Sequence, residues 1–535
     1  MTIQARVRLA SLLPLLTSFS IAACSGSSTP VTQSSGGTPA ANGGASNGGA
    51  VSGGVSSGGA VATGGVQIGG AANPSNGGSA TGGANAGGKS GTATGGATNP
   101  GNGGNATGGA PNPGNGGSAT GGKAGAATGG VAAGGKGGVA AGAPATGGTA
   151  NPGTGGAAAG ASGSGYTENT GANCVATAAP MLSAKNPKLP DPFAMHDGTR
   201  ITTKSQWECR RNEVKKDIEK YEIGTKPEPP TVAATLSGTT LSVKVTTSSG
   251  TITLTSTVAG SGSCVVIGMN SNSSLVSGCT QVPFKHDQVV QYANGGGSQF
   301  QSDPFYTVYP SLFGKVGNYA AWSWGISRLI DGLEQVKSQL NIDTTKIAVH
   351  GCSYAGKMAL FGGAFDERVA LTVAQESGGG GITSWRTSQD FATRTSTNVE
   401  KIDNTNYSWF LSSMKSLDPY SLPHDHHELI AMVAPRAIIA LGNTGYEWLG
   451  DESGYKSITA AAEVFKAMGV PENIGYDFTG GHSHCAAATS QTAAVAAFVN
   501  KFLKGQTADT AIAVKPVATK YDLTYTNTWT TPTLQ

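Results

Sequence analysis

The chain has 535 residues, with 34 Lys and Arg against 31 Asp and Glu, and 50 of its 83 glycines fall in residues 25–165. Residues 1–165 hold five basic residues and no acidic ones, so the formal net charge of +3 becomes 29 basic against 31 acidic residues over 166–535. This balance argues against a nucleic-acid partner. The uneven distribution of glycine divides the chain into a glycine-rich segment and a part of ordinary composition.

Residues 1–23 are predicted to be an export signal. Two arginines precede an apolar run over residues 9–21, which has the length of a signal-peptide core and is too short for a membrane span. The run ends in Ile-Ala-Ala-Cys at Cys24, which resembles the bacterial lipobox and implies a lipid on the Cys24 thiol. Ser25 after it favours the outer membrane. We expect an outer-membrane or cell-surface lipoprotein, and an ordinary cleaved signal with secretion is the alternative.

Residues 24–165 are predicted to be a disordered linker behind this anchor. Gly-Gly pairs with Ala, Ser, Thr and Asn bury too little apolar surface to offset the entropy of ordering. The absence of a strict Gly-X-Y period excludes collagen. The repeat at 99–104 and 112–117 is too irregular for a solenoid. A Gly-rich coil of this length reaches roughly 65 Å, which suits a bulky substrate.

Seven cysteines are an odd number for an exported protein, and lipidated Cys24 accounts for one of them. The other six suit three disulfides in an oxidising compartment. Their wide spacing without a C-x-x-C pair argues against a zinc site. The six are Cys174, Cys209, Cys264, Cys279, Cys352 and Cys485.

Residues 166–535 are predicted to form one α/β domain. Strands that alternate with helices indicate a mostly parallel sheet in a three-layer α/β/α sandwich, and the period-two segment 231–258 predicts antiparallel edge strands. In chain order we expect a helix over 206–221, the antiparallel strands, a helix over 320–340, a strand over 346–350, a helix from about 356, strands over 369–374 and 437–441, a helix over 458–468 and a strand over 474–478.

Ser353 follows the strand 346–350 inside the segment Gly-Cys-Ser-Tyr-Ala-Gly. A serine on a tight strand-to-helix turn between glycines is the nucleophile elbow of the α/β-hydrolase fold. The second glycine comes one residue later than in G-x-S-x-G, and the alternative is a glycine-rich turn with an incidental serine.

A serine nucleophile needs a base from a later strand end. The segment Gly-Gly-His-Ser-His-Cys after the strand 474–478 offers His482 and His484. If Cys485 pairs with Cys352, the bridge joins the residue before the serine to the residue after His484. His484 is then the base, and His482 is a structural neighbour.

The acid of the triad has several candidates. The usual order of the fold places it after the strand 437–441, where Glu447, Asp451 and Glu452 lie, and Glu376 follows the earlier strand 369–374. Topology alone favours Glu447 or Asp451, and the residues by themselves do not decide.

The run His-Asp-His-His-Glu at 424–428 suggests a metal site at first sight. Adjacent histidines in a loop rarely converge on one ion, so we expect packing here and no metal.

Several segments resemble, in the same order, the glucuronoyl esterases of carbohydrate esterase family fifteen. The likeness covers roughly residues 171–505. The matching segments are Asp-Pro-Phe at 191–193, Trp-Glu-Cys-Arg-Arg at 207–211, Trp-Ser-Trp-Gly at 322–325, Gly-Cys-Ser at 351–353 with Gly-Lys at 356–357, Gln-Glu-Ser-Gly at 375–378, Asp-His-His at 425–427, Ala-Pro-Arg at 434–436, Trp-Leu at 448–449 and His-Cys at 484–485.

The resemblance implies the triad Ser353, His484 and Glu376, against the choice of acid from topology. It also implies disulfides that join Cys352 to Cys485 and Cys174 to Cys209. We expect the remaining pair, Cys264 and Cys279, to staple a local hairpin.

Tyr354 departs from the family, which usually has an arginine after the serine to help hold the oxyanion. The backbone N–H of Tyr354 can still donate, and so can its hydroxyl, but the positive charge is lost. Loss of one oxyanion donor typically costs about 100-fold to 1000-fold in rate.

Three further residues are implied as substrate-binding. Lys357 lies one helical turn after Ser353, where an ammonium suits sugar hydroxyls; the alternative is a solvated lysine. Trp448 offers a face for stacking on a sugar; the alternative is a core residue. Glu400 falls near a polar position of the family, although the local match is poor.

The resemblance implies a serine ester hydrolase that cleaves esters between (4-O-methyl)glucuronic acid on xylan and lignin alcohols, through an acyl-enzyme, as a monomer and without a cofactor. One alternative, which Tyr354 keeps open, is an acetyl or feruloyl esterase on plant polysaccharide. Another is a surface carbohydrate-binding protein whose catalytic site has decayed.

Overall fold

The structure is a computed structural model that describes residues 167–169, 174–292, 299–525 and 527–535. The predicted signal segment, Cys24 and the glycine-rich segment 25–165 lie outside the described residues. No helix among the described residues is both long and apolar enough to cross a membrane.

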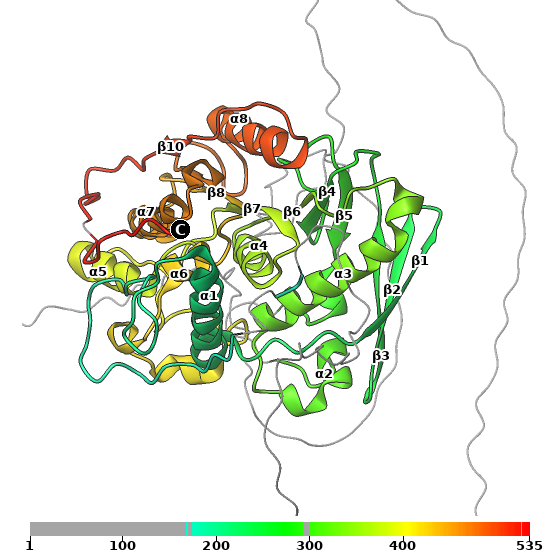
Figure 1. The fold of residues 1–535 in the computed structure, drawn as a ribbon, viewed down its shortest axis with the longest axis horizontal. Helices are drawn as coiled ribbons and strands as arrows, with labels where there is room; N and C mark the ends of the chain where they lie inside the picture. Colours follow the sequence, from blue (N-terminus) through cyan, green and yellow to red (C-terminus); the bar gives the residue numbers. More distant parts are fainter. Residues whose placement is uncertain (1–166, 170–173, 293–298, 526) are drawn as a thin grey trace, which may run out of the picture. The chain divides into compact units, whose positions relative to one another are not determined.

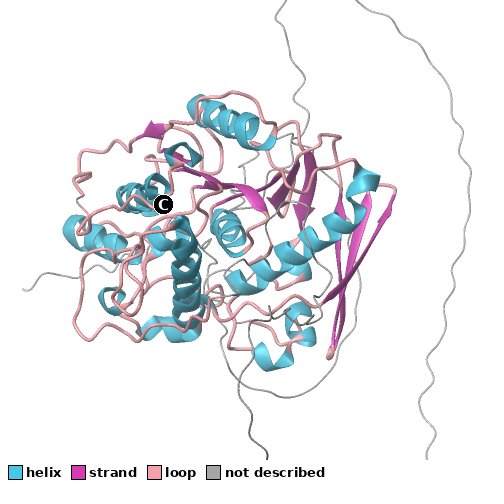
Figure 2. Ribbon diagram, in the orientation of Figure 1, coloured by secondary structure: helices cyan, strands magenta, loops and turns pink. Residues whose placement is uncertain are grey.

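A parallel sheet forms the centre of the described part (Figures 1 and 2). Its order is β10-β9-β8-β7-β6-β4-β5, and every pair of neighbours runs parallel. The inner strands are buried runs of apolar residues, as expected when helices cover both faces. The strands are β4 (Val265–Met269), β5 (Thr280–Phe284), β6 (Ile347–Cys352), β7 (Val369–Gln375), β8 (Ala437–Leu441), β9 (Ile474–Asp477) and β10 (Ala513–Val514).

Helices cover the two faces of this sheet, so the three-layer α/β/α prediction is confirmed. Alternate residues of one strand point to opposite layers: Ile438 and Ala440 join one apolar core, and Ile439 joins the other. The first core contains residues of α3, α4, α6 and α7, and the second contains residues of α8. The helices are α1 (Lys204–Ile218), α2 (Pro304–Val308), α3 (Asn318–Leu340), α4 (Tyr354–Phe365), α5 (Trp385–Thr395), α6 (His426–Ala431), α7 (Asp451–Ala467) and α8 (Thr489–Phe498).

The antiparallel strands form a second sheet of their own, in the order β1 (Thr231–Ser237), β2 (Thr240–Thr247) and β3 (Gly250–Thr257). Strand β2 buries alternate residues, including Val243. Gly332 of α3 lies against that valine, and a Cβ at this position would come within 2.3 Å of a Val243 methyl. The period-two pattern therefore predicted antiparallel strands correctly, but they form a separate sheet and not the edge of the parallel one.

The disulfide between Cys264 and Cys279 does not staple a hairpin. Each cysteine directly precedes one of two adjacent strands, β4 and β5, and these strands run parallel. Parallel neighbours need a crossover connection, which here is the segment 270–279. The bridge therefore joins the amino-terminal ends of β4 and β5.

A buried, neutral histidine lies in β6, the strand that precedes Ser353. His350 in β6 is buried, its Nδ1 lies 2.8 Å from the Ser273 hydroxyl, and its Nε2 lies 3.3 Å from Oε1 of Gln375. Gln375 in turn donates to the carbonyl of Ala486, beside the loop of His484. Burial lowers the pKa of His350 to about 4.

Acid should therefore destabilise the domain through His350. The unfolded chain takes up a proton near pH 6.5, whereas folded His350 takes it up near pH 4, so the free energy of unfolding falls across this window by about 3 kcal/mol. The variant His350→Gln keeps a donor and an acceptor but cannot titrate. Urea unfolding at steps between about pH 6.5 and about pH 4 should give a flatter curve for the variant. Parallel curves would show that His350 is not the responsible group.

Candidate active site

The nucleophile elbow is present where β6 meets α4. Ser353 has φ 59° and ψ −127°, a left-handed conformation that only a tight turn requires. Gly351 and Gly356 are dictated by close approach, since a Cβ would lie 2.1 Å from the Ala355 carbonyl oxygen or 2.3 Å from that of Gln375, respectively. The late second glycine therefore packs α4 against β7.

His484 and Glu376 form a hydrogen-bonded pair. Nδ1 of His484 lies 2.5 Å from Oε2 of Glu376, and the backbone N–H of Cys485 donates to the same oxygen at 3.2 Å. The carboxylate therefore favours the proton on Nδ1 and leaves the lone pair on Nε2. Nε2 of His484 and Oγ of Ser353 have no hydrogen-bond partner within the part of the chain described here. These two atoms are the ones that a serine–histidine proton transfer would join.

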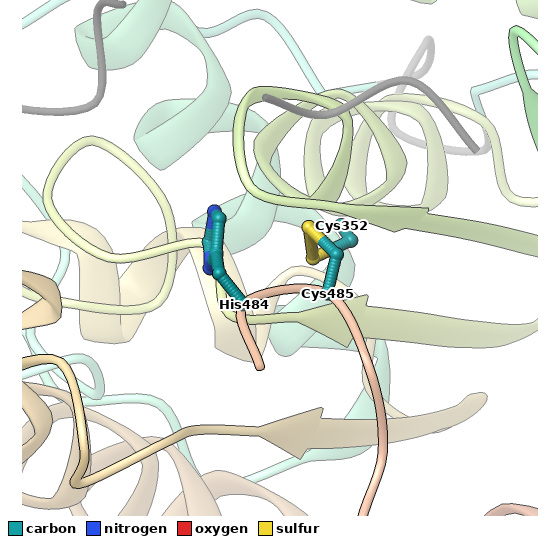
Figure 3. Close-up of side chains that lie close together, drawn as sticks. All are labelled: Cys352, His484 and Cys485. Carbon is teal, nitrogen blue, oxygen red and sulfur yellow. A yellow bond between two sulfur atoms is a disulfide. The ribbon is translucent and has the colours of Figure 1, made fainter. Parts of the chain in front are cut away.

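The disulfide between Cys352 and Cys485 ties the two loops together (Figure 3). Their Cα atoms are 5.6 Å apart, so the residue before Ser353 is bonded to the residue after His484. The two sulfur atoms and a ring nitrogen of His484 lie within 4.8 Å of one another. Because the sulfurs are bonded to each other, this cluster presents a disulfide and not two thiolates. The structure also joins Cys174 to Cys209, as the resemblance implied.

The other candidate acids have different surroundings. Glu447 is 55% exposed and pairs with Lys520, and Glu452 is buried against Arg394 and Lys456. Asp451 is buried at the start of α7, and its burial together with the nearby charge of Glu376 holds its pKa well above the usual range. The charged form of Asp451 is therefore disfavoured in the fold. Of these four carboxyls, Glu376 contacts His484.

His482 occupies a supporting position. Its Nδ1 accepts from the Asn443 side chain at 3.1 Å and its Nε2 donates to the Thr479 carbonyl at 2.9 Å. Both ring nitrogens are therefore occupied. Nδ1 also lies 3.7 Å from Oε1 of Glu376.

The proposed substrate residues divide into buried and open ones. Lys357 and Glu400 are buried and paired, with Nζ 2.7 Å from Oε2 of Glu400, so a freely solvated lysine is excluded. Trp448 is partly exposed and meets the His484 ring edge-on at 4.9 Å. Tyr446, which sequence reasoning missed, accepts the backbone N–H of His484 at 3.1 Å. No spacing or motif in the sequence marks that contact.

Tyr354 turns its side chain into the core. It is 3% exposed, and its hydroxyl lies 2.9 Å from Nε2 of His286. Burial, with Tyr292 and Asp287 close by, raises the pKa of Tyr354, so it remains a hydroxyl at neutral pH. The hydroxyl of Tyr354 is therefore engaged with His286.

The histidines of the 424–428 run are structural in their contacts. His424 and His426 each bond one carboxylate oxygen of Glu222, at 2.7 and 2.8 Å, and His427 bonds the Pro190 carbonyl. Burial lowers the pKa of His426, but the charge of Glu222 and the hydrogen bonds to Glu222 and Gly381 together outweigh it, and the net shift is upward. This network lies beneath the loop that follows Glu376, because His426 also bonds the Gly381 carbonyl.

The parallel sheet, the serine elbow and the histidine–carboxylate pair at neighbouring strand ends define the α/β-hydrolase class. The family model described as "Glucuronyl esterase, fungi" matches residues 237–469. A 4-O-methyl-glucuronoyl methylesterase of Hypocrea jecorina is 37% identical over 374 residues, which cover 68% of this chain and 80% of the relative. The chain therefore belongs to the glucuronoyl esterase family.

Other relatives agree with this assignment. A 4-O-methyl-glucuronoyl methylesterase of Thermothelomyces thermophilus is 39% identical over 336 residues, 60% of this chain and 82% of that relative. The catalytic domain of the Hypocrea jecorina glucuronoyl esterase superposes with a TM-score of 0.61 at 36% identity, covering 66% of this chain and 98% of that one. A serine-to-alanine mutant of the Sporotrichum thermophile glucuronoyl esterase was solved in complex with methyl 4-O-methyl-β-D-glucopyranuronate. It superposes with a TM-score of 0.60 at 34% identity, covering 66% of this chain and 96% of that one.

The contact with His484 predicts how substitutions of the acids should rank. Glu376→Gln should lower kcat by about 1000-fold or more, because the amide no longer holds the proton on Nδ1. Glu447→Gln should leave kcat nearly unchanged, and Asp451→Asn, which replaces a carboxyl whose charged form is disfavoured by burial, should have a small effect. Steady-state kinetics of the three variants test the ranking. A larger loss from Asp451→Asn or Glu447→Gln than from Glu376→Gln would move the acid to that residue.

Proposed function

We propose that the protein hydrolyses esters of (4-O-methyl)glucuronic acid, with Ser353 as nucleophile, His484 as base and Glu376 as orienting acid. The observation that carries the proposal is the contact of 2.5 Å between His484 and Glu376, on loops bonded through the Cys352–Cys485 disulfide to the serine elbow. The identity of 37% to a named 4-O-methyl-glucuronoyl methylesterase supports the substrate class.

In the proposed reaction, Oγ of Ser353 attacks the uronate carbonyl carbon while Nε2 of His484 takes the serine proton. The imidazolium, stabilised by Glu376, returns that proton to the leaving alcohol. A water molecule, deprotonated by His484, then cleaves the acyl-enzyme to glucuronate and free Ser353. These steps need no cofactor.

Backbone N–H groups stabilise the oxyanion of the tetrahedral intermediate in this proposal. Tyr354 is the first residue of α4, and the first N–H groups of a helix have no partner within the helix. The positive end of the helix dipole points the same way. The N–H of Tyr354 is therefore the proposed oxyanion donor beside Ser353.

The buried pair Lys357 and Glu400 and the partly exposed Trp448 are proposed to hold the sugar. Trp448 lies edge-on to His484, which places its partly exposed ring beside the proposed base. The pairing with Glu400 fixes the position of the Lys357 ammonium.

Turnover of benzyl glucuronate tests the substrate class. The wild type should hydrolyse it with a higher kcat/KM than an acetylated xylo-oligosaccharide, and Ser353→Ala should abolish turnover. A preference for the acetylated compound would favour the acetyl or feruloyl esterase alternative. Binding of xylan without turnover of either ester at any concentration would favour a decayed, carbohydrate-binding protein.

We also propose that the chain is exported and anchored through a lipid on Cys24, with residues 25–165 as spacer. Three disulfides support export, since such bonds persist in oxidising compartments. In a bacterial host, the wild type should partition into the membrane fraction and Cys24→Ser into the soluble fraction. Mass spectrometry of the N-terminal peptide should show an acylated cysteine in the wild type. An unmodified cysteine in an exported, soluble wild type would refute the anchor.

A further inference from the structure

The residue after Ser353 is held by a contact outside the reacting groups. The hydroxyl of Tyr354 lies 2.9 Å from Nε2 of His286, which is the second residue after β5 and is 1% exposed. Nδ1 of His286 lies 2.9 Å from a carboxylate oxygen of Asp287, as a close charge without hydrogen-bond geometry. This carboxylate favours the proton on Nδ1, so Nε2 accepts and the Tyr354 hydroxyl donates.

Aromatic rings enclose the contact on several sides. The ring of Tyr354 lies 4.3 Å from that of Tyr292 and stacks on Trp409 at 5.9 Å between centroids. Trp322 lies 6.4 Å from Tyr354 and 5.4 Å from His286. Packing of this density restricts rotation of the tyrosine ring, so the hydroxyl cannot turn toward Ser353 without displacing its neighbours.

We propose that His286 is a positioning residue of the oxyanion site. It anchors the hydroxyl of Tyr354, and the anchored side chain fixes the backbone N–H of the same residue beside Ser353. A tyrosine turned into the core brings no charge to the oxyanion, so catalysis depends on where that N–H points. The inference rests on the proposed role of Ser353 as nucleophile.

Three substitutions separate positioning from direct donation by the hydroxyl. Tyr354→Phe and His286→Phe should each lower kcat about tenfold with KM unchanged, because a small misplacement of a catalytic group has a large effect on rate. His286→Gln should restore kcat to within about twofold of the wild type, since its amide oxygen can accept from Tyr354. If the hydroxyl itself donated to the oxyanion, His286→Phe would release it and leave kcat unchanged or higher, which would overturn the proposal.

The double variant Tyr354→Phe with His286→Phe covers the case in which His286→Phe folds poorly. The single variant buries a hydroxyl without a partner, which destabilises the fold, whereas the double variant buries none. The double variant should recover thermal stability yet keep kcat at the level of Tyr354→Phe. Recovery of kcat together with stability would show that the contact serves only the fold.

Ligand affinity gives a readout that a purely structural role would not move. A boronic acid analogue, which forms a tetrahedral adduct with serine, should bind Tyr354→Phe about tenfold more weakly, in step with kcat, whereas glucuronate should bind equally well. The kinetics are measured on whichever ester the wild type hydrolyses, benzyl glucuronate or an acetylated xylo-oligosaccharide. A wrong substrate assignment would therefore not affect the test of this proposal. Equal kcat in the wild type and all variants would refute the proposal.

Discussion

A single row of paired residues across the parallel sheet fixes where the site is built. Cys352 of β6 pairs with Gln375 of β7, Gln375 with Leu441 of β8, and Leu441 with Asp477 of β9. All four lie at the carboxyl ends of their strands, and the chain leaves the sheet just beyond them. Ser353 and Glu376 are the next residues after two members of this row. A shift of one residue in any pairing would turn these side chains to the other face of the sheet.

The loops beyond this row adopt strained backbone conformations. Among the described residues other than glycine, six have positive φ, and three of them are Ser353, Glu376 and Cys485, with φ of 59°, 44° and 66°. Such conformations cost on the order of 1–3 kcal/mol each and persist only where the surroundings over-determine them. Here the surroundings are the Cys352–Cys485 bridge, the bond from the Glu376 N–H to the Leu441 carbonyl, and the contact of Glu376 with His484.

Much of this architecture could be predicted from the sequence because it depends on local patterns. The patterns predict β6 to β9, α1 and α3 to within a few residues, whereas α7 begins seven residues before its predicted start at 458. Strands β4 and β5 were missed, because strands of five residues carry little periodic signal, and β5 also contains Gln281 and Pro283. The hairpin expected at Cys264 and Cys279 failed for the same reason: the direction of a short strand depends on distant neighbours.

The site was less predictable wherever it depended on contacts between distant segments. The elbow and the two histidines are marked by glycines and local order. The choice between Glu376 and Asp451 is not marked in this way, because both residues follow neighbouring strands and differ only in the side chains that they contact. His286 and Tyr446 lie far along the chain from the residues that they support, so no motif contains both partners.

The pairing of Lys357 with Glu400 also bears on product release. The ester that enters the proposed site is neutral at its carbonyl, whereas the acid that leaves is an anion. Lys357 already shares its charge with a buried carboxylate, Tyr354 brings none, and Glu376 adds a negative charge close to the base. A newly formed carboxylate therefore meets little net attraction where it is generated. The lack of a net positive charge near the reacting carbonyl, which leaves backbone N–H groups as the oxyanion donors, therefore also favours release of the product anion.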